Sequence, residues 1–269
     1  MEKDSVKPTE IETTLIICSE DPETVVEEIA DIKTILNYQL FPNENKKIHD
    51  WYWDTEDNSL LKNRLSLRFR EVNSKQLITL KGDAKISNWG GIERLEIELP
   101  WSKEGLLQIL NEIKEKGVIR NPMSDRLDFD QPILVFKELG FELVQNRETK
   151  RRIRNFVIKN REQVLAELAI DFVRYKIGNK PVHHFELEIE SKHENGIKVL
   201  RTCSEYLCKK YSKTLHKWKH SKLTTGKALE NLLKKEPRET VVSTFNNVLP
   251  STYKKLTEFL NIMIYNFCK

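Results

Sequence analysis

The chain has 269 residues, of which 39% are hydrophobic and 32% are charged. This composition excludes a disordered chain and suffices for one large folded domain, or for one domain with appendages. The 45 Lys and Arg residues nearly balance the 41 Asp and Glu residues, and the resulting net charge of +4 is too small to indicate a nucleic-acid or membrane partner.

Segments with the period-two alternation of β-strands dominate the first two thirds of the chain. They cover residues 10–18, 47–53, 64–72, 76–82, 92–99, 148–158, 164–173 and 183–191. Residues 21–37 and 102–117 have helical periodicity instead, and Asp21 and Ser102 are suitable N-terminal caps. Neither flank of residues 118–140 completes a separate pattern of strands and helices, so we expect this stretch to be a junction inside one fold.

The last third of the chain ends in helix-forming sequence. A helix is predicted over residues 195–211, and two more are predicted over 224–236 and 250–267. The last helix either packs on the rest of the fold or closes one end of a cavity.

Charged residues repeat at every second position on most predicted strands, with apolar residues between them. The rows are Glu10 and Glu12; Arg68 and Arg70; Arg94, Glu96 and Glu98; Lys150, Arg152 and Arg154; and Glu186, Glu188 and Glu190. Lys81 and Asp171 occupy similar settings singly. An antiparallel sheet with one hydrated face alternates in the same way, but like charges two residues apart repel and ordinary surfaces mix the signs. The uniform sign of most rows therefore indicates that something compensates each group of charges.

A sheet that closes into a barrel with its charged face inward would bury these rows, which costs several kcal/mol per charge unless each is paired or liganded. Asp and Glu clusters suit Mg²⁺ or Mn²⁺, whereas Arg and Lys clusters suit the oxygens of a polyphosphate. A triphosphate that carries a metal ion would satisfy both groups at once. The sequence has no Gly-rich phosphate loop, which agrees with phosphate being held by side chains.

The ordered motifs resemble the CYTH, or triphosphate tunnel metalloenzyme, superfamily over about residues 8–226. The motifs are EIETT, WYWDTEDNSLLKNRLSLRFR, LITLKG, ERLEIELP, KRRIRNF, ELAIDF, FELEIE and HSKL, in that order. The resemblance implies an α+β fold in residues 1–226, namely an eight-stranded antiparallel β-barrel that forms a tunnel, with helices packed outside. Residues 227–269 would be a C-terminal helical extension packed on the same domain.

The resemblance also implies an enzyme that hydrolyses a triphosphate with Mg²⁺ or Mn²⁺, such as inorganic tripolyphosphate or thiamine triphosphate. The implied phosphate ligands are Arg68, Arg70, Lys81, Arg94, Lys150, Arg152 and Lys222. The implied metal ligands are Glu10, Glu12, Asp171, Glu186 and Glu188, with Glu96 and Glu98 in metal or hydrogen-bonding roles. Glu10, Glu12 and Lys81 would be catalytic.

Thr14 departs from the family pattern, which opens with ExExK and has a Lys at this position. A Thr hydroxyl can donate one hydrogen bond but carries no charge. Two further hypotheses therefore stand beside hydrolysis: an adenylyl cyclase of the same fold, and a polyphosphate- or nucleotide-binding module that has lost catalysis.

We expect a cytoplasmic protein whose partner is a small-molecule triphosphate. The first ten residues lack the apolar core of a signal peptide, and no apolar stretch reaches the ~20 residues that span a bilayer. Lysines in residues 209–222 surround Tyr211 and Trp218, but a solvated segment that leads from a helix to a strand is favoured there over a nucleic-acid site. The sequence contains no indication of an oligomeric state.

Overall fold

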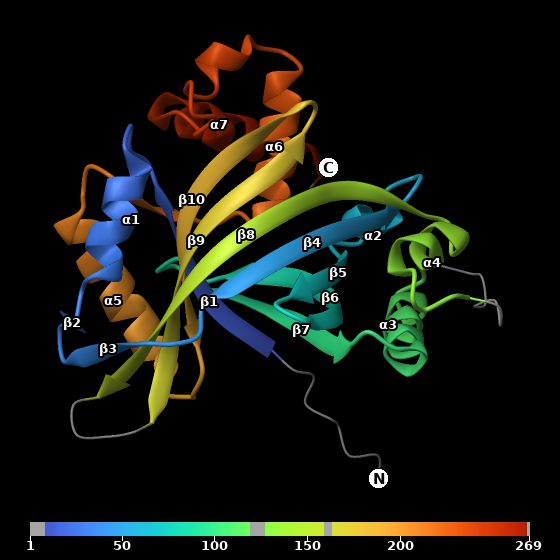
Figure 1. Ribbon diagram of the computed structural model, residues 1–269, viewed down its shortest axis with the longest axis horizontal. Helices are drawn as coiled ribbons and strands as arrows, with labels where there is room; N and C mark the ends of the chain where they lie inside the picture. Colours follow the sequence, from blue (N-terminus) through green and yellow to red (C-terminus); the bar gives the residue numbers. More distant parts are fainter. Residues whose placement is uncertain (1–8, 119–126, 159–162, 268–269) are drawn as a thin grey trace. The chain divides into compact units, whose positions relative to one another are not determined.

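The chain divides into two compact units. The structure, a computed structural model, describes residues 9–118, 127–158 and 163–267, with side chains up to residue 260. The first unit contains the described residues up to Glu10 together with Lys47–Ile86 and Ile92–Asn146, and the second contains Ile11–Lys46, Ser87–Gly91 and the chain from Arg147 onward. Strands β1 (Thr9–Ile17) and β8 (Phe141–Ile158) each contribute to both units (Figure 1).

The strands form one antiparallel sheet whose order closes on itself. The neighbours are β8, β4, β5, β6, β7, β1, β10 and β9 in turn, and β9 pairs again with β8. Short strands β2 (Thr34–Ile35) and β3 (Tyr38–Pro42) extend from β8, and β11 (Leu215–Trp218) pairs with β1. The predicted α+β fold with an eight-stranded antiparallel barrel is therefore confirmed.

The first unit packs the apolar face of four strands against a helix. Its elements are β4 (Lys46–Thr55), α2 (Ser59–Lys62), β5 (Ser66–Val72), β6 (Lys75–Ile86), β7 (Ile92–Pro100), α3 (Lys103–Glu115) and α4 (Pro132–Glu138). Leu67, Ile78 and Ile97 of the strands share a buried cluster with Leu106 and Ile109 of α3. Because side chains alternate along a strand, Arg68 and Arg70 of β5 and Glu96 and Glu98 of β7 lie on the opposite face.

The second unit covers its strands with helices on the apolar side. Its elements are α1 (Pro22–Ala30), β9 (Val164–Ile177), β10 (Lys180–Ser191), α5 (Gly196–Lys210), α6 (Lys222–Leu233), a 3₁₀ turn (Arg238–Thr240) and α7 (Pro250–Phe267). Leu187 and Ile189 of β10 pack with Val199 and Leu200 of α5. A separate buried cluster packs α6 and α7 against the last residues of β9 and the first residues of β10, including Val173, Tyr175 and Val182. In the described ranges, no helix is both long enough and apolar enough to cross a membrane.

Several helices and strands end at other residues than the sequence predicts, because contacts between elements determine where they end. Helix α1 begins at Pro22 as expected, with the Asp21 side chain accepting from the Thr24 amide at 3.2 Å, but it ends at Ala30 because Thr34–Ile35 pair with β3 instead. The predicted junction at 118–140 contains helix α4, while its residues 119–126 lie outside the described residues. Strand β11 lies within residues 209–222, where a segment leading from helix to strand was expected.

Candidate functional site

The first unit carries a row of ion pairs on the charged face of its strands. The register places Asp50 of β4 opposite Arg70 of β5, and Arg70 donates from Nε and Nη2 to the two carboxylate oxygens at 2.7 and 3.0 Å. Arg68 is 3% exposed and donates from Nη2 to Thr79 Oγ1 and to Glu98 Oε2, both at 3.0 Å. Antiparallel pairing across β4 to β7 therefore builds an alternating array of basic and acidic groups.

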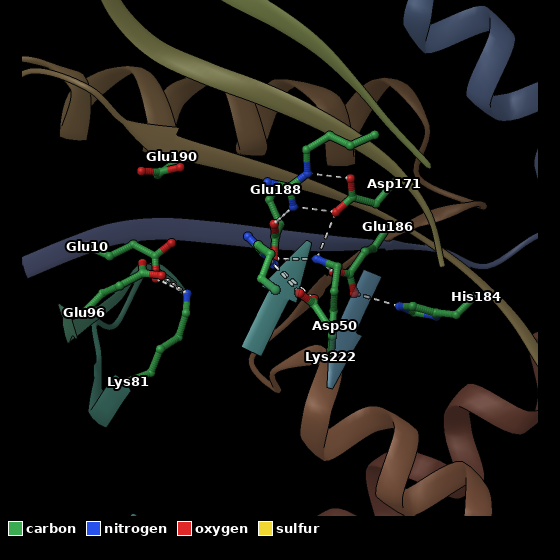
Figure 2. Close-up of polar contacts among 12 residues, drawn as sticks. Glu10, Asp50, Lys81, Glu96, Asp171, His184, Glu186, Glu188, Glu190 and Lys222 are labelled. Carbon is green, nitrogen blue, oxygen red and sulfur yellow. Dashed lines mark hydrogen bonds and ion pairs between the residues drawn. The ribbon is translucent and has the colours of Figure 1, made fainter. Parts of the chain in front are cut away.

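A second group in the same unit gathers around Glu10 at the start of β1. The Lys81 ammonium lies 2.8 Å from Glu10 Oε2 and 3.0 Å from Glu96 Oε1, as Figure 2 shows. Arg94 also donates from Nε to Glu10 Oε2 at 3.0 Å. Burial alone would raise the pKa of Glu10, but attraction to Lys81 and Arg94 outweighs it and holds the pKa well below its usual range. Glu10 is therefore a carboxylate at neutral pH.

Three carboxylates meet in the second unit. Asp171 of β9 lies opposite Glu186 of β10 in the register, and Glu188 follows two residues later on the same face. One oxygen from each lies within 4.8 Å of the others. Asp171 and Glu186 are fully buried, at 0% and 1% exposed, and Figure 2 shows the three side chains converging. These three residues are called the acidic triad below.

Two cations occupy the acidic triad. The Lys222 ammonium lies 3.0 Å from Asp171 Oδ2 and 2.6 Å from Glu188 Oε1, and it also contacts Glu186 Oε1. Arg151 of β8 donates from Nε and Nη2 to Asp171 at 2.8 and 2.6 Å, and from Nη2 to Glu188 at 2.5 Å. The triad is thus neutralised in part by two side chains from separate elements.

Local structure fixes the position of Lys222. It is the first residue of α6, whose N-terminus is capped by Ser221 accepting from the Thr224 amide at 3.2 Å. The Tyr175 hydroxyl donates to the Lys222 carbonyl at 2.9 Å, which ties the start of α6 to β9. The short HSKL motif therefore delivers its Lys through a helix start that is anchored to the sheet.

Electrostatics favour the charged forms of Asp171 and Lys222. Burial would raise the pKa of Asp171, but Arg151 and Lys222 lower it below its usual range. Burial would likewise lower the pKa of Lys222, but the three carboxylates raise it above its usual range. Asp171 and Lys222 therefore each favour the charged form of the other.

The acidic triad offers the donor set of a hard divalent cation. Mg²⁺ and Mn²⁺ prefer carboxylate oxygens, and the three triad oxygens are close enough together to bind one ion. Asp171, Glu186 and Glu188 would be its protein ligands. Because Lys222 already lies among these oxygens, a metal ion and the ammonium would compete for them.

Two predicted phosphate ligands of β8 lie away from the triad. The register places Arg151 opposite Asp171 and Arg152 opposite Ile170, so Arg152 lies on the face opposite the triad. Arg152 is half-exposed and lies 2.6 Å from a carboxylate oxygen of Glu27 in α1. Lys150 is exposed, with its ammonium 5.9 Å from the centre of the Phe172 ring. The structure thus corrects the expected row of Lys150, Arg152 and Arg154 by one residue.

The remaining predicted residues lie on the charged faces of the two units. Those of the first unit are Glu10, Arg68, Arg70, Lys81, Arg94, Glu96 and Glu98. Those of the second unit are Glu12, Asp171, Glu186, Glu188 and Lys222. On β1, Glu12 lies opposite Glu190 and Thr14 lies opposite Glu188, and both β1 side chains are 4% exposed.

Sequence reasoning missed three residues of these clusters. Asp50 stands within a predicted strand. Pairing that strand with the next one across their hairpin would have placed Asp50 opposite the predicted Arg70. Arg151 was missed because the period-two pattern assigned its neighbours Lys150 and Arg152 to the charged row instead. His184 precedes Glu186 by two residues and therefore shares its face, which was a usable signal. Its Nε2 lies 2.7 Å from Glu186 Oε2.

Comparison with known proteins places the chain in a family. The family model of the CYTH domain matches residues 19–219. HpAC1 from Hippeastrum, which carries the name of an adenylyl cyclase and has a dominant triphosphatase activity, is 20% identical with a TM-score of 0.52, covering 81% of this chain and 95% of that chain. Protein PH1819 from Pyrococcus horikoshii OT3 is 18% identical with a TM-score of 0.46, covering 84% and 99%.

More distant similarity extends to a viral enzyme. The RNA triphosphatase domain of the mimivirus mRNA capping enzyme is 14% identical with a TM-score of 0.41, covering 77% of this chain and 87% of that chain. A search of curated proteins finds no match. Because the family match spans most of the sequence and HpAC1 has the same fold, the chain belongs to the CYTH domain family.

Proposed function

We propose that the chain is a divalent-metal-dependent triphosphatase that hydrolyses inorganic tripolyphosphate or an organic triphosphate such as thiamine triphosphate. The observation that carries this proposal is the acidic triad, in which the buried Asp171 and Glu186 and the partly buried Glu188 lie against Lys222 and Arg151. Buried carboxylates and buried cations in one cluster suit a ligand that brings both a metal ion and phosphate oxygens.

In the second unit, the acidic triad and its two cations each have a role in this proposal. Asp171, Glu186 and Glu188 would hold the cation, which when bound would offset phosphate charge and orient the attacking water. Lys222 and Arg151 would then turn from the carboxylates to phosphate oxygens, where Arg can donate two parallel hydrogen bonds. Arg151 takes the role that the sequence assigned to Lys150 and Arg152.

In the first unit, the basic residues Arg68, Arg70, Lys81 and Arg94 are the proposed phosphate ligands. Each is held by a carboxylate in the structure, so each guanidinium or ammonium group is already oriented before a ligand binds. Glu10, Glu96 and Glu98 would supply further metal or hydrogen-bonding oxygens in this unit, as Glu12 would in the second unit. By resemblance to the family, Glu10, Glu12 and Lys81 would be catalytic. Positioned cations of this kind stabilise the charge that spreads over a transferred phosphoryl group.

The test is phosphate release from tripolyphosphate, thiamine triphosphate and ATP, each with Mg²⁺ and with Mn²⁺. Glu188→Gln removes one triad charge, and we expect turnover to fall at least 100-fold. The matched control is Glu148→Gln on β8, where Glu148 pairs with Arg174 at 3.3 Å on a half-exposed surface. Absence of turnover on every substrate, or equal turnover in the two variants, would contradict the proposal.

A second candidate function is binding without hydrolysis, and it rests on Thr14. The family pattern has a Lys at this position, whereas the buried Thr14, which lies opposite Glu188 in the β1–β10 register, carries no charge. Metal-dependent binding of tripolyphosphate without turnover, together with turnover in Thr14→Lys, would favour this function. Formation of cyclic AMP from ATP in the same assay would identify a cyclase instead.

A further inference from the structure

A buried hydrogen-bonded chain leads from helix α7 to the acidic triad. The Tyr253 hydroxyl of α7 lies 2.8 Å from His184 Nδ1, and His184 Nε2 lies 2.7 Å from Glu186 Oε2. His184 is fully buried and Tyr253 is 4% exposed. Tyr253 lies beyond residues 19–219, so the C-terminal helix adds a group that the family match does not include.

The chemistry of the three groups fixes the direction of this chain. A carboxylate oxygen accepts hydrogen bonds, so in the 2.7 Å contact we assign the N–H of His184 Nε2 as the donor and Glu186 Oε2 as the acceptor. In the tautomer with the proton on Nε2, Nδ1 is an acceptor, and the Tyr253 hydroxyl donates to it at 2.8 Å. Burial raises the pKa of Tyr253 well above its ordinary value, and the phenol therefore keeps the proton that it donates.

This chain leaves Glu186 with two different oxygens. Oε2 is held by His184, whereas Oε1 points to the centre of the triad, where it contacts Lys222. In Figure 2, His184 approaches Glu186 from the side away from Asp171 and Glu188. The carboxylate therefore cannot rotate without losing a buried hydrogen bond.

We propose that Tyr253 and His184 are positioning residues that hold the Glu186 carboxylate in the orientation required for cation binding, a role that rests on the function proposed above. Helix α7 supports them because Leu256 and Leu260 pack in the same buried cluster as Val173 and Val182. Partners that orient a ligating carboxylate typically contribute 10- to 100-fold to metal affinity. The C-terminal helix would thus be part of the metal site, even though it supplies no ligand to it.

The test is Mn²⁺ binding to the full chain, measured by isothermal titration calorimetry without substrate. Tyr253→Phe removes only the hydroxyl, and we expect the Kd for Mn²⁺ to rise about tenfold. His184→Phe removes the donor to Glu186 and should raise the Kd further. The matched control is Thr252→Val on the same helix, because the buried Thr252 hydroxyl donates to the Val241 carbonyl at 2.8 Å, away from the triad.

A purely structural role predicts a different result from a positioning role. If Tyr253 only supports the core, Tyr253→Phe and Thr252→Val will lower the free energy of unfolding alike and leave the Kd for Mn²⁺ unchanged. That result would overturn the inference but not the triphosphatase proposal. No Mn²⁺ binding by the unmodified protein would overturn both. Nitrogen chemical shifts of His184 give a readout independent of metal and variants: we expect Nε2 to carry a proton, and a proton on Nδ1 alone would refute the chain.

Discussion

Replacing Lys222 by Met tests whether its ammonium stands in the acidic triad as a cation. The Met side chain keeps most of the apolar length but removes the charge, so the triad would keep Arg151, which pairs with Asp171 and Glu188, but lose the ammonium that contacts all three carboxylates. Lys222 is 8% exposed, and its three contacts are to carboxylates that are themselves largely buried. Removing one partner of a buried ion pair costs about 3–5 kcal/mol, because the opposite charge stays behind without compensation.

We therefore expect Lys222→Met to lower the free energy of unfolding by about 3–5 kcal/mol in urea at pH 7 without divalent metal. Added Mg²⁺ should recover part of this loss, because a cation that binds only the folded state stabilises it by mass action. The Kd for Mn²⁺ should fall below that of the unmodified protein, since no ammonium competes for the triad. Affinity for metal-free tripolyphosphate should fall at the same time.

The matched control is Lys234→Met at the end of α6. Lys234 pairs with Glu230 at 2.8 Å one helical turn away, but its side chain is 65% exposed. Such surface pairs contribute about 0.3–0.5 kcal/mol, so this variant should be nearly neutral. If Lys222→Met is no more destabilised than Lys234→Met, or if Mg²⁺ stabilises it no more than the unmodified protein, Lys222 does not neutralise the triad.

Two further predictions use urea unfolding. Arg151→Met should cost several kcal/mol because it uncovers buried carboxylates, whereas Arg152→Met should cost less than about 1 kcal/mol; equal losses would contradict the observed register. Burial, helped by Lys219, lowers the pKa of His220 to about 4, so the unfolded chain binds a proton first as the pH falls. The free energy of unfolding should therefore decline as the pH falls from about 6.5 to 4. This decline should be less steep in His220→Asn, and it should be as steep as in the unmodified protein in the exposed control His216→Asn.

Much of the fold could be predicted because its strands are hydrophobic on one face and charged on the other. That pattern located the eight barrel strands, and capping residues located the starts of α1 and α3. The ends of elements depend on contacts that the sequence does not display. Residues 34–35 continue the helical periodicity of α1, yet backbone pairing with β3 draws them into a hairpin, and Leu36 takes a φ of 54° in its turn.

The candidate site was predictable wherever charge and apolar positions alternate without ambiguity. In RLSLRFR and FELEIE the apolar residues identify one face, and the structure places the charged residues on the other. His184 and Tyr253 were not predictable as a pair, because 69 residues separate them and only the packing of α7 brings them together. Long-range contacts of this kind leave no periodic signal in one sequence.

The run KRRIRNF shows why alternation fails when nearly every position is basic. Ile153 is the one apolar residue among residues 150–154. If Ile153 is assigned to the apolar face that the helices cover, alternation assigns Lys150, Arg152 and Arg154 to the charged face. Pairing with β9 instead places Ile153 and Arg151 on the face that carries Asp171. The opposite face accepts its basic residues because α1 provides acceptors: Glu27 pairs with Arg152, and Arg154 donates to backbone carbonyls that include Ala30 at the end of the helix.

Arg154 shows that partners, rather than parity, determine where a charge can be buried. Its side chain is 6% exposed, and it donates from Nη2 to the carbonyls of Ile32 and Leu40 at 3.1 and 2.8 Å. Carbonyls at the end of a helix carry partial negative charge, which favours a cation there. A guanidinium on the apolar face is therefore stable beside α1, while the guanidinium of Arg151, three residues earlier and on the other face, is stabilised by Asp171 and Glu188.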